Sequence, residues 1–246
     1  MSEAIGSSTD NATWWSKGTL IAAAIVLVGL PLSALGYRWG IWGLGFAFTA
    51  LRYLFYFAIV ALASTLVVGV IALVKKRRKD AVTVAHALVM VVIPAAFVLM
   101  QFRAVQGVPP IHDITTDGVN PPMFSGLVDG VPERSLKYED VYDQQQSAYP
   151  DIESIASSLS VADAYAKALA AAASLGWEIA REDQSAGIFE AVDTTFWYGF
   201  KDDVIIRVVS QGGGSMVDVR SVSRIGRSDV GKNADRIREF IRAFQP

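Results

Sequence analysis

Three long apolar runs constrain this chain more than any other feature. They cover about residues 18–35, 48–74 and 81–101. Each is long enough to cross roughly 30 Å of hydrocarbon at about 1.5 Å per helical residue. Core helices of soluble proteins rarely contain such runs, and 52% of the whole chain is hydrophobic while only 19% is charged. The sequence therefore predicts a membrane region over residues 1–103 with three transmembrane helices.

The charges beside these runs predict an orientation. Five consecutive basic residues, 75–79, separate the second and third runs, whereas the loop between the first two contains only Arg38. Basic loops stay in the cytoplasm. We therefore expect a multi-pass protein of a bacterial inner membrane, with a cytoplasmic N-terminus and a periplasmic C-terminal part.

Arg52 lies near the start of the second run, among aromatic residues that are typical of a membrane interface. These are Trp39, Trp42, Tyr53 and Tyr56. We favour an arginine that reaches the interface over a functional charge inside the membrane, and both alternatives stay open.

Residues 104–246 are numerous enough for one domain with its own core. Residues 104–159 contain two proline pairs, at 109–110 and 121–122, and two single prolines, Pro132 and Pro150. We therefore expect an extended linker that packs on the domain. The chain has no cysteine, which excludes disulfides, thiol nucleophiles and cysteine-ligated metals. We expect neither a metal site nor a cofactor.

Residues 160–246 show the periodicity of an α+β core. An amphipathic helix is predicted from Ser160 to Gly176, and a second over residues 228–244. Four strands are predicted between them, at residues 177–182, 188–195, 204–210 and 216–222. Short glycine-bearing connections favour antiparallel pairing. The expected fold is a four-stranded antiparallel sheet with two helices on one face, a two-layer sandwich.

Residues 226–233, GRSDVGKN, come within one letter of a phosphate-binding loop. Asn233 replaces the hydroxyl residue that would bind magnesium, and Asp229 places a carboxylate where phosphate would lie. Only 13 residues follow Asn233. We therefore expect no nucleotide and no nucleic acid as partner, and interpret Ser228 or Asp229 as the cap of the last helix.

Charge is distributed unevenly in this half of the chain. Residues 104–203 contain 5 basic and 17 acidic residues, and residues 204–246 contain 8 and 4. An anion site on the polar face of the sheet is one interpretation. Its candidate ligand-binding residues are Arg207, Arg220, Arg224, Ser228 and Asp229. Ion pairing with acidic residues such as Asp113 and Asp117 is the alternative that we favour.

His112 is the one histidine outside the apolar runs, and it lies in the segment IHDITTD. With Asp113 or Asp117 it is a candidate for acid–base catalysis or metal binding. A structural, hydrogen-bonded loop uses the same residue types, and we favour that interpretation.

Several segments together resemble a known family. These are PPIHDITTD, AYPDI, LGWEI, GFKDDVIIRV and VDVRSVSRIGRSDVGKNADRIR. They are similar to bacterial proteins of the domain of unknown function 1499 family, over about residues 104–246. The resemblance implies an envelope protein, and it carries over no catalytic residue.

These observations favour a non-catalytic membrane protein whose exported domain binds an anionic lipid, a glycolipid or a protein partner of the cell envelope. The alternative is a hydrolase of envelope lipid or glycan that uses His112 with Asp113 or Asp117.

Overall fold

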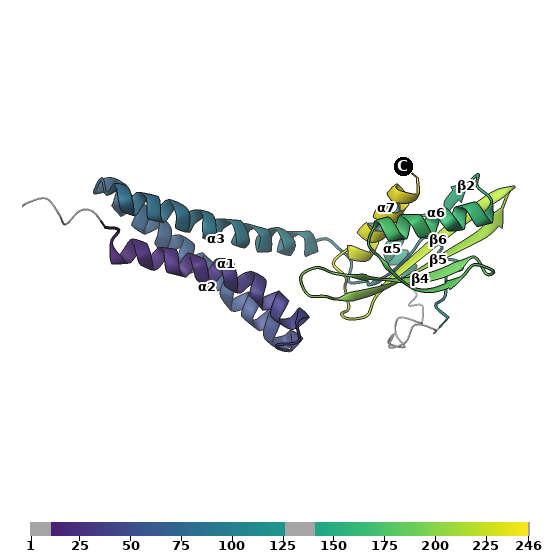
Figure 1. The fold of residues 1–246 in the computed structure, drawn as a ribbon, viewed down its shortest axis with the longest axis horizontal. Coiled ribbons are helices and arrows are strands. Elements are labelled where there is room, and N and C mark those ends of the chain that lie inside the picture. Colours follow the sequence, from purple (N-terminus) through teal and green to yellow (C-terminus); the bar gives the residue numbers. More distant parts are fainter. Residues whose placement is uncertain (1–10, 126–140, 246) are drawn as a thin grey trace, which may run out of the picture. The chain divides into compact units, whose positions relative to one another are not determined.

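The computed structural model describes residues 11–125 and 141–245, and the chain forms two compact units, residues 1–103 and 104–246 (Figure 1). Each unit has its own buried core. The two units are therefore described separately.

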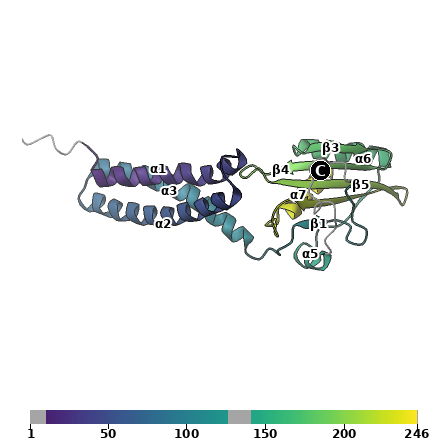
Figure 2. The same ribbon diagram turned by 90° about the horizontal axis from the view of Figure 1, so that it is seen from below.

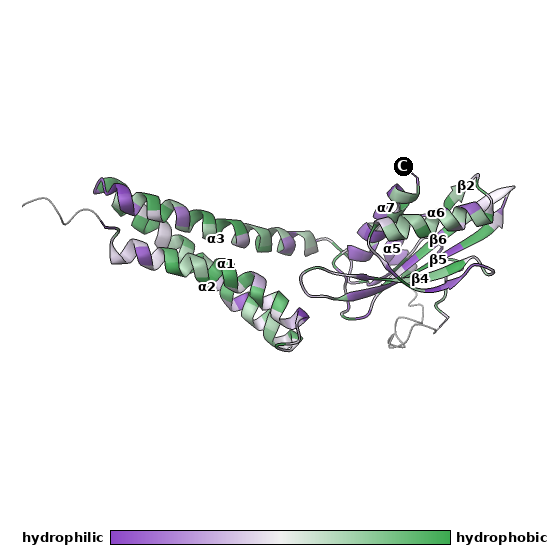
Figure 3. Ribbon diagram, in the orientation of Figure 1, coloured by the Kyte–Doolittle hydropathy of each residue, from purple (hydrophilic) through white to green (hydrophobic). Residues whose placement is uncertain are grey.

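The first unit consists of three long helices, α1 (Trp14–Arg38), α2 (Leu44–Val74) and α3 (Arg78–Val105). All three are long and apolar enough to cross a membrane, so the prediction of three membrane-capable helices is confirmed. Most of their residues are hydrophobic (Figure 3). Helices α1 and α3 extend beyond their predicted apolar runs at both ends, and α2 extends beyond its run at the start.

Small side chains line the contacts among these helices. Ala23, Ala58, Ala61 and Ala87 are almost completely buried there. Without a hydrophobic driving force in lipid, helices associate through close packing, which small residues permit.

A carboxylate from α3 completes the start of α1. Asp80 accepts hydrogen bonds from the Thr13 amide at 2.7 Å, from the Thr13 hydroxyl at 2.9 Å and from the Ser16 hydroxyl at 2.8 Å. It therefore supplies the acceptor and the negative charge that a helix N-terminus favours. Sequence analysis did not identify this residue.

Arg52 is exposed on α2, and its guanidinium lies 5.6 Å from the centre of the Tyr53 ring. Such a cation over an aromatic face fits an interfacial arginine.

The second unit is built on an antiparallel sheet with the order β1-β6-β5-β4-β3, in which β2 also pairs with β6 (Figure 2). Its strands are β1 (Asp113–Thr115), β2 (Ile155–Ser157), β3 (Glu178–Asp183), β4 (Ile188–Thr194), β5 (Lys201–Gln211) and β6 (Gly214–Ser223). The antiparallel sheet was predicted correctly. The predicted number of four strands was wrong, because six are present.

The two additional strands and a short helix come from residues 104–159. Strands β1 and β2 have three residues each and pair with successive parts of the same edge of β6. Helix α5 (Tyr142–Ala148) places Gln145 beside β1, where its side chain exchanges two hydrogen bonds with the backbone of Thr115. Three-residue strands are too short to show alternation, so no periodic pattern predicts them.

Helices α6 (Val161–Ser174) and α7 (Lys232–Phe244) cover one face of the sheet (Figure 1). The Ser160 hydroxyl accepts the Asp163 amide, which is the predicted cap of α6. Trp177 stacks on Phe240 of α7 with ring centres 5.6 Å apart. This layer holds the main core. None of the helices in the described residues covers the opposite face of the sheet, which we call the helix-free face.

Candidate functional site

Strand alternation divides β5 and β6 between the two faces. Val208 and Val219 belong to the core under the helices. Arg207, Asp218 and Arg220 alternate with such residues and lie on the helix-free face, as predicted. All three candidate ligand-binding arginines thus lie on this face or at its edge, and each forms an ion pair with a carboxylate.

Arg220 makes the most deeply buried of these ion pairs. Its Nε and one terminal nitrogen donate to the two Asp113 oxygens at 2.9 and 2.8 Å, and both side chains are at most 1% exposed. The second terminal nitrogen donates to the Pro122 carbonyl at 3.1 Å, and the Phe124 ring lies against the guanidinium. Arg220 therefore fastens β1 and the following loop onto the sheet, and a ligand could not reach it without displacing Asp113.

Arg224 has a similar arrangement at the end of β6. Its Nε and a terminal nitrogen donate to Asp203 at 3.0 and 2.6 Å, and Asp203 is buried. The carboxylate occupies the position that an external anion would need. The geometry of Arg224 fits the ion-pairing alternative.

The backbone amides at the N-terminus of α7 already donate hydrogen bonds to side chains of the preceding residues. The Asp229 carboxylate accepts the amides of Gly231 and Asn233, each at 2.8 Å, and the Ser228 hydroxyl accepts the Val230 amide at 3.2 Å. Burial raises the pKa of Asp229, while the two amide hydrogen bonds act against that rise. The same carboxylate would oppose a phosphate, which fits the interpretation of this stretch as a cap.

His112 is buried, with 2% of its surface exposed. Its carbonyl oxygen accepts the Ser223 amide at 3.0 Å and the Asn233 side-chain amide at 2.8 Å. Asp113, its neighbour, faces Arg220, and Asp117 faces Arg207. The two proposed carboxylate partners of His112 are therefore each bound to an arginine.

Sequence analysis missed the buried polar network under α7. Asn233 and Arg236 are almost fully buried, and Arg236 donates to Asp202 at 2.7 Å and to Asp193 at 2.8 Å. The network also includes Ser221 and Ser223. A signal was present: both α7 residues fall on its inner, otherwise apolar side.

An open depression of about 430 Å³ lies on the helix-free face. It is lined by Asp117, Asn120, Ser154, Arg207, Val209, Gln211, Met216 and Asp218. We call it the Arg207 depression. The Arg207 guanidinium lies between two carboxylates, 2.8 Å from Asp117 and 2.7 Å from Asp218, and the Ser154 hydroxyl donates to Asp218 at 2.5 Å.

The chemistry of this depression is mixed. One guanidinium and two carboxylates leave it with a formal charge of −1, which disfavours an anionic ligand. Asn120 and Gln211 are exposed at its rim, and each carries an amide that both donates and accepts hydrogen bonds. Val209 and Met216 add apolar surface. Such a lining suits a neutral molecule rich in hydroxyl groups.

A metal site is not formed by the part of the chain that the structure describes. Within residues 11–125 and 141–245, no three His, Cys, Asp or Glu side chains are grouped so that they could hold a metal ion.

Comparison with known proteins gives one match. No curated protein and no solved structure is similar to this chain. One family model, described as a protein of unknown function (DUF1499), matches residues 113–244, from the first residue of β1 to the last of α7. The matched region contains all six strands and the Arg207 depression, and leaves out the three apolar helices. The chain therefore belongs to the DUF1499 family.

Proposed function

We propose that this protein is an integral inner-membrane protein whose exported α+β domain binds a hydroxyl-rich component of the cell envelope, such as a glycan or the headgroup of a glycolipid. The role is one of binding and not of catalysis. The observation that carries the proposal is the Arg207 depression, an open polar site on the helix-free face of the sheet.

The membrane half supports the location. Three membrane-capable helices precede the domain, and the basic residues 75–79 form the connection between α2 and α3 together with the first residues of α3. By the positive-inside rule, this basic segment supports a cytoplasmic α2–α3 connection and a domain on the other side of the membrane.

The depression favours a glycan over an anionic lipid. Arg207 is already shared between Asp117 and Asp218, so an added anion would meet two carboxylates and a neutralised guanidinium. Neighbouring sugar hydroxyls can both donate to those carboxylates and accept from the rim amides.

The hydrolase alternative has less support from the geometry. A general base needs an accepting oxygen that lies within hydrogen-bond reach of the proton that it removes. Asp113 is held by Arg220, and Asp117 by Arg207.

The binding proposal can be tested by native mass spectrometry of the full-length protein, released from its own membrane in mild detergent. The wild type should carry an added mass. The double variant Asn120→Ala with Gln211→Ala removes two rim amides without removing a buried side chain. We expect its bound fraction to fall at least about tenfold, because each lost hydrogen bond contributes about 1 kcal/mol.

The matched control is Gln146→Ala with Gln184→Ala, which removes two exposed amides elsewhere on the domain. It should keep the added mass. A wild type that carries no added mass, or an equal loss in the control, would contradict the proposal.

A further inference from the structure

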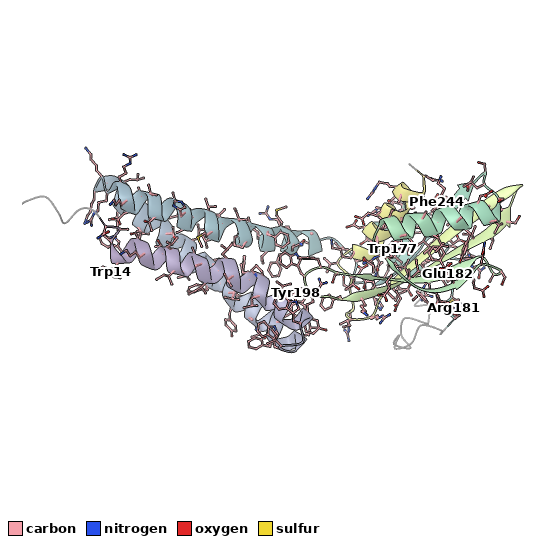
Figure 4. All side chains as sticks on the ribbon, viewed as in Figure 1. Trp14, Trp177, Arg181, Glu182, Tyr198 and Phe244 are labelled. Carbon is pink, nitrogen blue, oxygen red and sulfur yellow. The ribbon has the colours of Figure 1, made fainter. Side chains whose placement is uncertain are left out.

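Two loops lie together at one end of the sheet. Residues 195–200 join β4 to β5, and residues 224–231 join β6 to α7. The Arg224 amide donates to the Lys201 carbonyl at 3.2 Å, which holds the bases of the two loops side by side. Tyr198 marks the β4–β5 loop in Figure 4. We call these two loops, with Lys201 and Lys232 at their ends, the loop surface.

The chain enters the domain at the same end. Strand β1 begins at Asp113, opposite Val222 near the end of β6. Before it, Val108 packs against the domain core, and one of its methyl carbons lies 3.4 Å from the position of a Cβ atom built on Gly231. Helix α3 ends at Val105. Only residues 106 and 107 lie between the end of α3 and Val108, so this end of the domain is the one that the chain links to a membrane-capable helix.

The loop surface is rich in aromatic side chains. Phe196 is 68% exposed, and Trp197, Tyr198 and Phe200 are partly exposed. Phe196 and Trp197 meet edge to face, and Tyr198 stacks on Phe200, each pair with ring centres 5.1 Å apart. Ile225 adds an aliphatic side chain that is 47% exposed. Aromatic rings with a polar group favour the headgroup region of a bilayer.

The exposed charges of the loop surface are basic. They belong to Lys201, Arg227 and Lys232. Three carboxylates at this end are buried and bound within the domain: Asp203 by Arg224, Asp202 by Arg236, and Asp229 by the α7 amides. A fourth, Asp193, is partly exposed and is also bound by Arg236. Each basic side chain near a membrane surface contributes about 1 kcal/mol of attraction to anionic lipid.

We propose that the loop surface docks on the headgroup layer of an anionic bilayer, the same bilayer that α1 to α3 cross. The aromatic rings enter the interface, and the three basic side chains bind lipid phosphates. This goes beyond glycan binding, because the Arg207 depression extends toward Gln211, at the opposite end of β5. Docking would direct the depression away from the lipid, whether or not a glycan occupies it.

The chain has no cysteine, so single cysteines can be labelled without background. Thr194→Cys lies at the base of the β4–β5 loop, and Gln184→Cys lies in the turn at the other end of β4; both positions are exposed. In each full-length variant the cysteine is labelled with an environment-sensitive fluorophore. The labelled protein is then reconstituted into lipid nanodiscs at one copy per disc. A quencher attached to the lipid headgroups then reports the proximity of the label.

We expect quenching at position 194 to exceed that at position 184 by about threefold or more in discs that contain phosphatidylglycerol. The difference should shrink in discs of phosphatidylcholine alone, and also in the variant Lys201→Glu, Arg227→Glu, Lys232→Glu. Equal quenching at both positions would overturn the proposal. So would quenching at 194 that neither lipid charge nor the variant changes.

A loop surface that instead meets a second copy or another protein would leave position 194 unquenched in single-copy discs, which also overturns the proposal. The comparison of the two positions needs no loop variant, so a folding defect in the variant cannot obscure it. Failure here would leave the glycan proposal intact, because the mass-spectrometric test uses the other end of the sheet.

Discussion

The arginines of the helix-free face have different roles because their exposure differs. Arg220 is fully buried beside Asp113, whereas the Arg207 side chain is 16% exposed and borders an open depression. A buried arginine paired with a carboxylate organises the fold. An arginine at the edge of solvent can also meet a ligand.

Replacing Arg220 tests the structural role. We expect Arg220→Ala to destabilise the domain by about 3–5 kcal/mol, because it leaves the Asp113 carboxylate buried and unpaired. The measurement is resistance of the full-length protein to brief proteolysis across a urea series. The exposed Arg227 provides the control, and Arg227→Ala should change stability by no more than about 0.5 kcal/mol.

Replacing both partners distinguishes an unpaired charge from lost packing. Arg220→Met combined with Asp113→Leu should recover much of the loss, since no charge is then left buried. If Arg220→Ala is as stable as the wild type, the Arg220–Asp113 pair does not hold β1 in place.

At the scale of elements, strand β6 organises the second unit. It pairs with β5 along one edge, and with β1 and then β2 along the other. The two short strands can form because β6 already presents an ordered row of backbone donors and acceptors. Through β1, the chain that arrives from α3 becomes part of the sheet that carries the Arg207 depression.

The turn before β4 gives a test of how closely these elements pack. Gly187 and Gly176 both have positive φ, 68° and 79°, but only at Gly187 would an added Cβ collide with the backbone oxygen of Val208. We expect Gly176→Ala to cost about 1 kcal/mol from backbone strain alone. Gly187→Ala should cost at least about 2 kcal/mol more, because the turn must move away from β5.

The same urea series measures both variants. Equal losses of stability in the two variants would show that strain at the positive φ dominates. The turn would then accept the added methyl group without disturbing β5.

At the scale of the whole molecule, a unit of three membrane-capable helices is followed directly by a sheet domain. Along the chain, the basic segment 75–79 lies at the start of α3, and the domain follows the end of α3. If α3 crosses the membrane, the basic segment and the domain must be on different sides.

Cysteine labelling tests this orientation directly. With Gln184→Cys in the domain and Arg78→Cys at the first residue of α3, within the basic segment, a membrane-impermeant maleimide should label position 184 in cells whose outer layer has been made permeable. Position 78 should react only after the inner membrane is broken, because the positive-inside rule keeps it in the cytoplasm. Labelling in the reverse order would contradict the proposed topology.

Patterns that repeat along the chain were sufficient to predict most of the helices and strands. The three apolar runs predicted α1 to α3, since a membrane-crossing helix needs only length and hydrophobicity. Alternation and turn residues predicted β3 to β6 and both helices of the sandwich, because those signals lie within each segment. The polar side of β5 and β6 followed from the same alternation.

Only the tertiary structure decided which distant residues meet. Strands β1 and β2 depend on an edge of β6 that lies far along the chain, and three residues carry no periodic signal of their own. Arg220 pairs with Asp113, 107 positions away, and no local pattern in the sequence connects the two residues. The Arg207 depression likewise joins Asn120, Ser154 and Gln211, which no spacing connects. Local patterns determine whether a segment forms a helix or a strand. A site depends on which segments the burial of the core brings together.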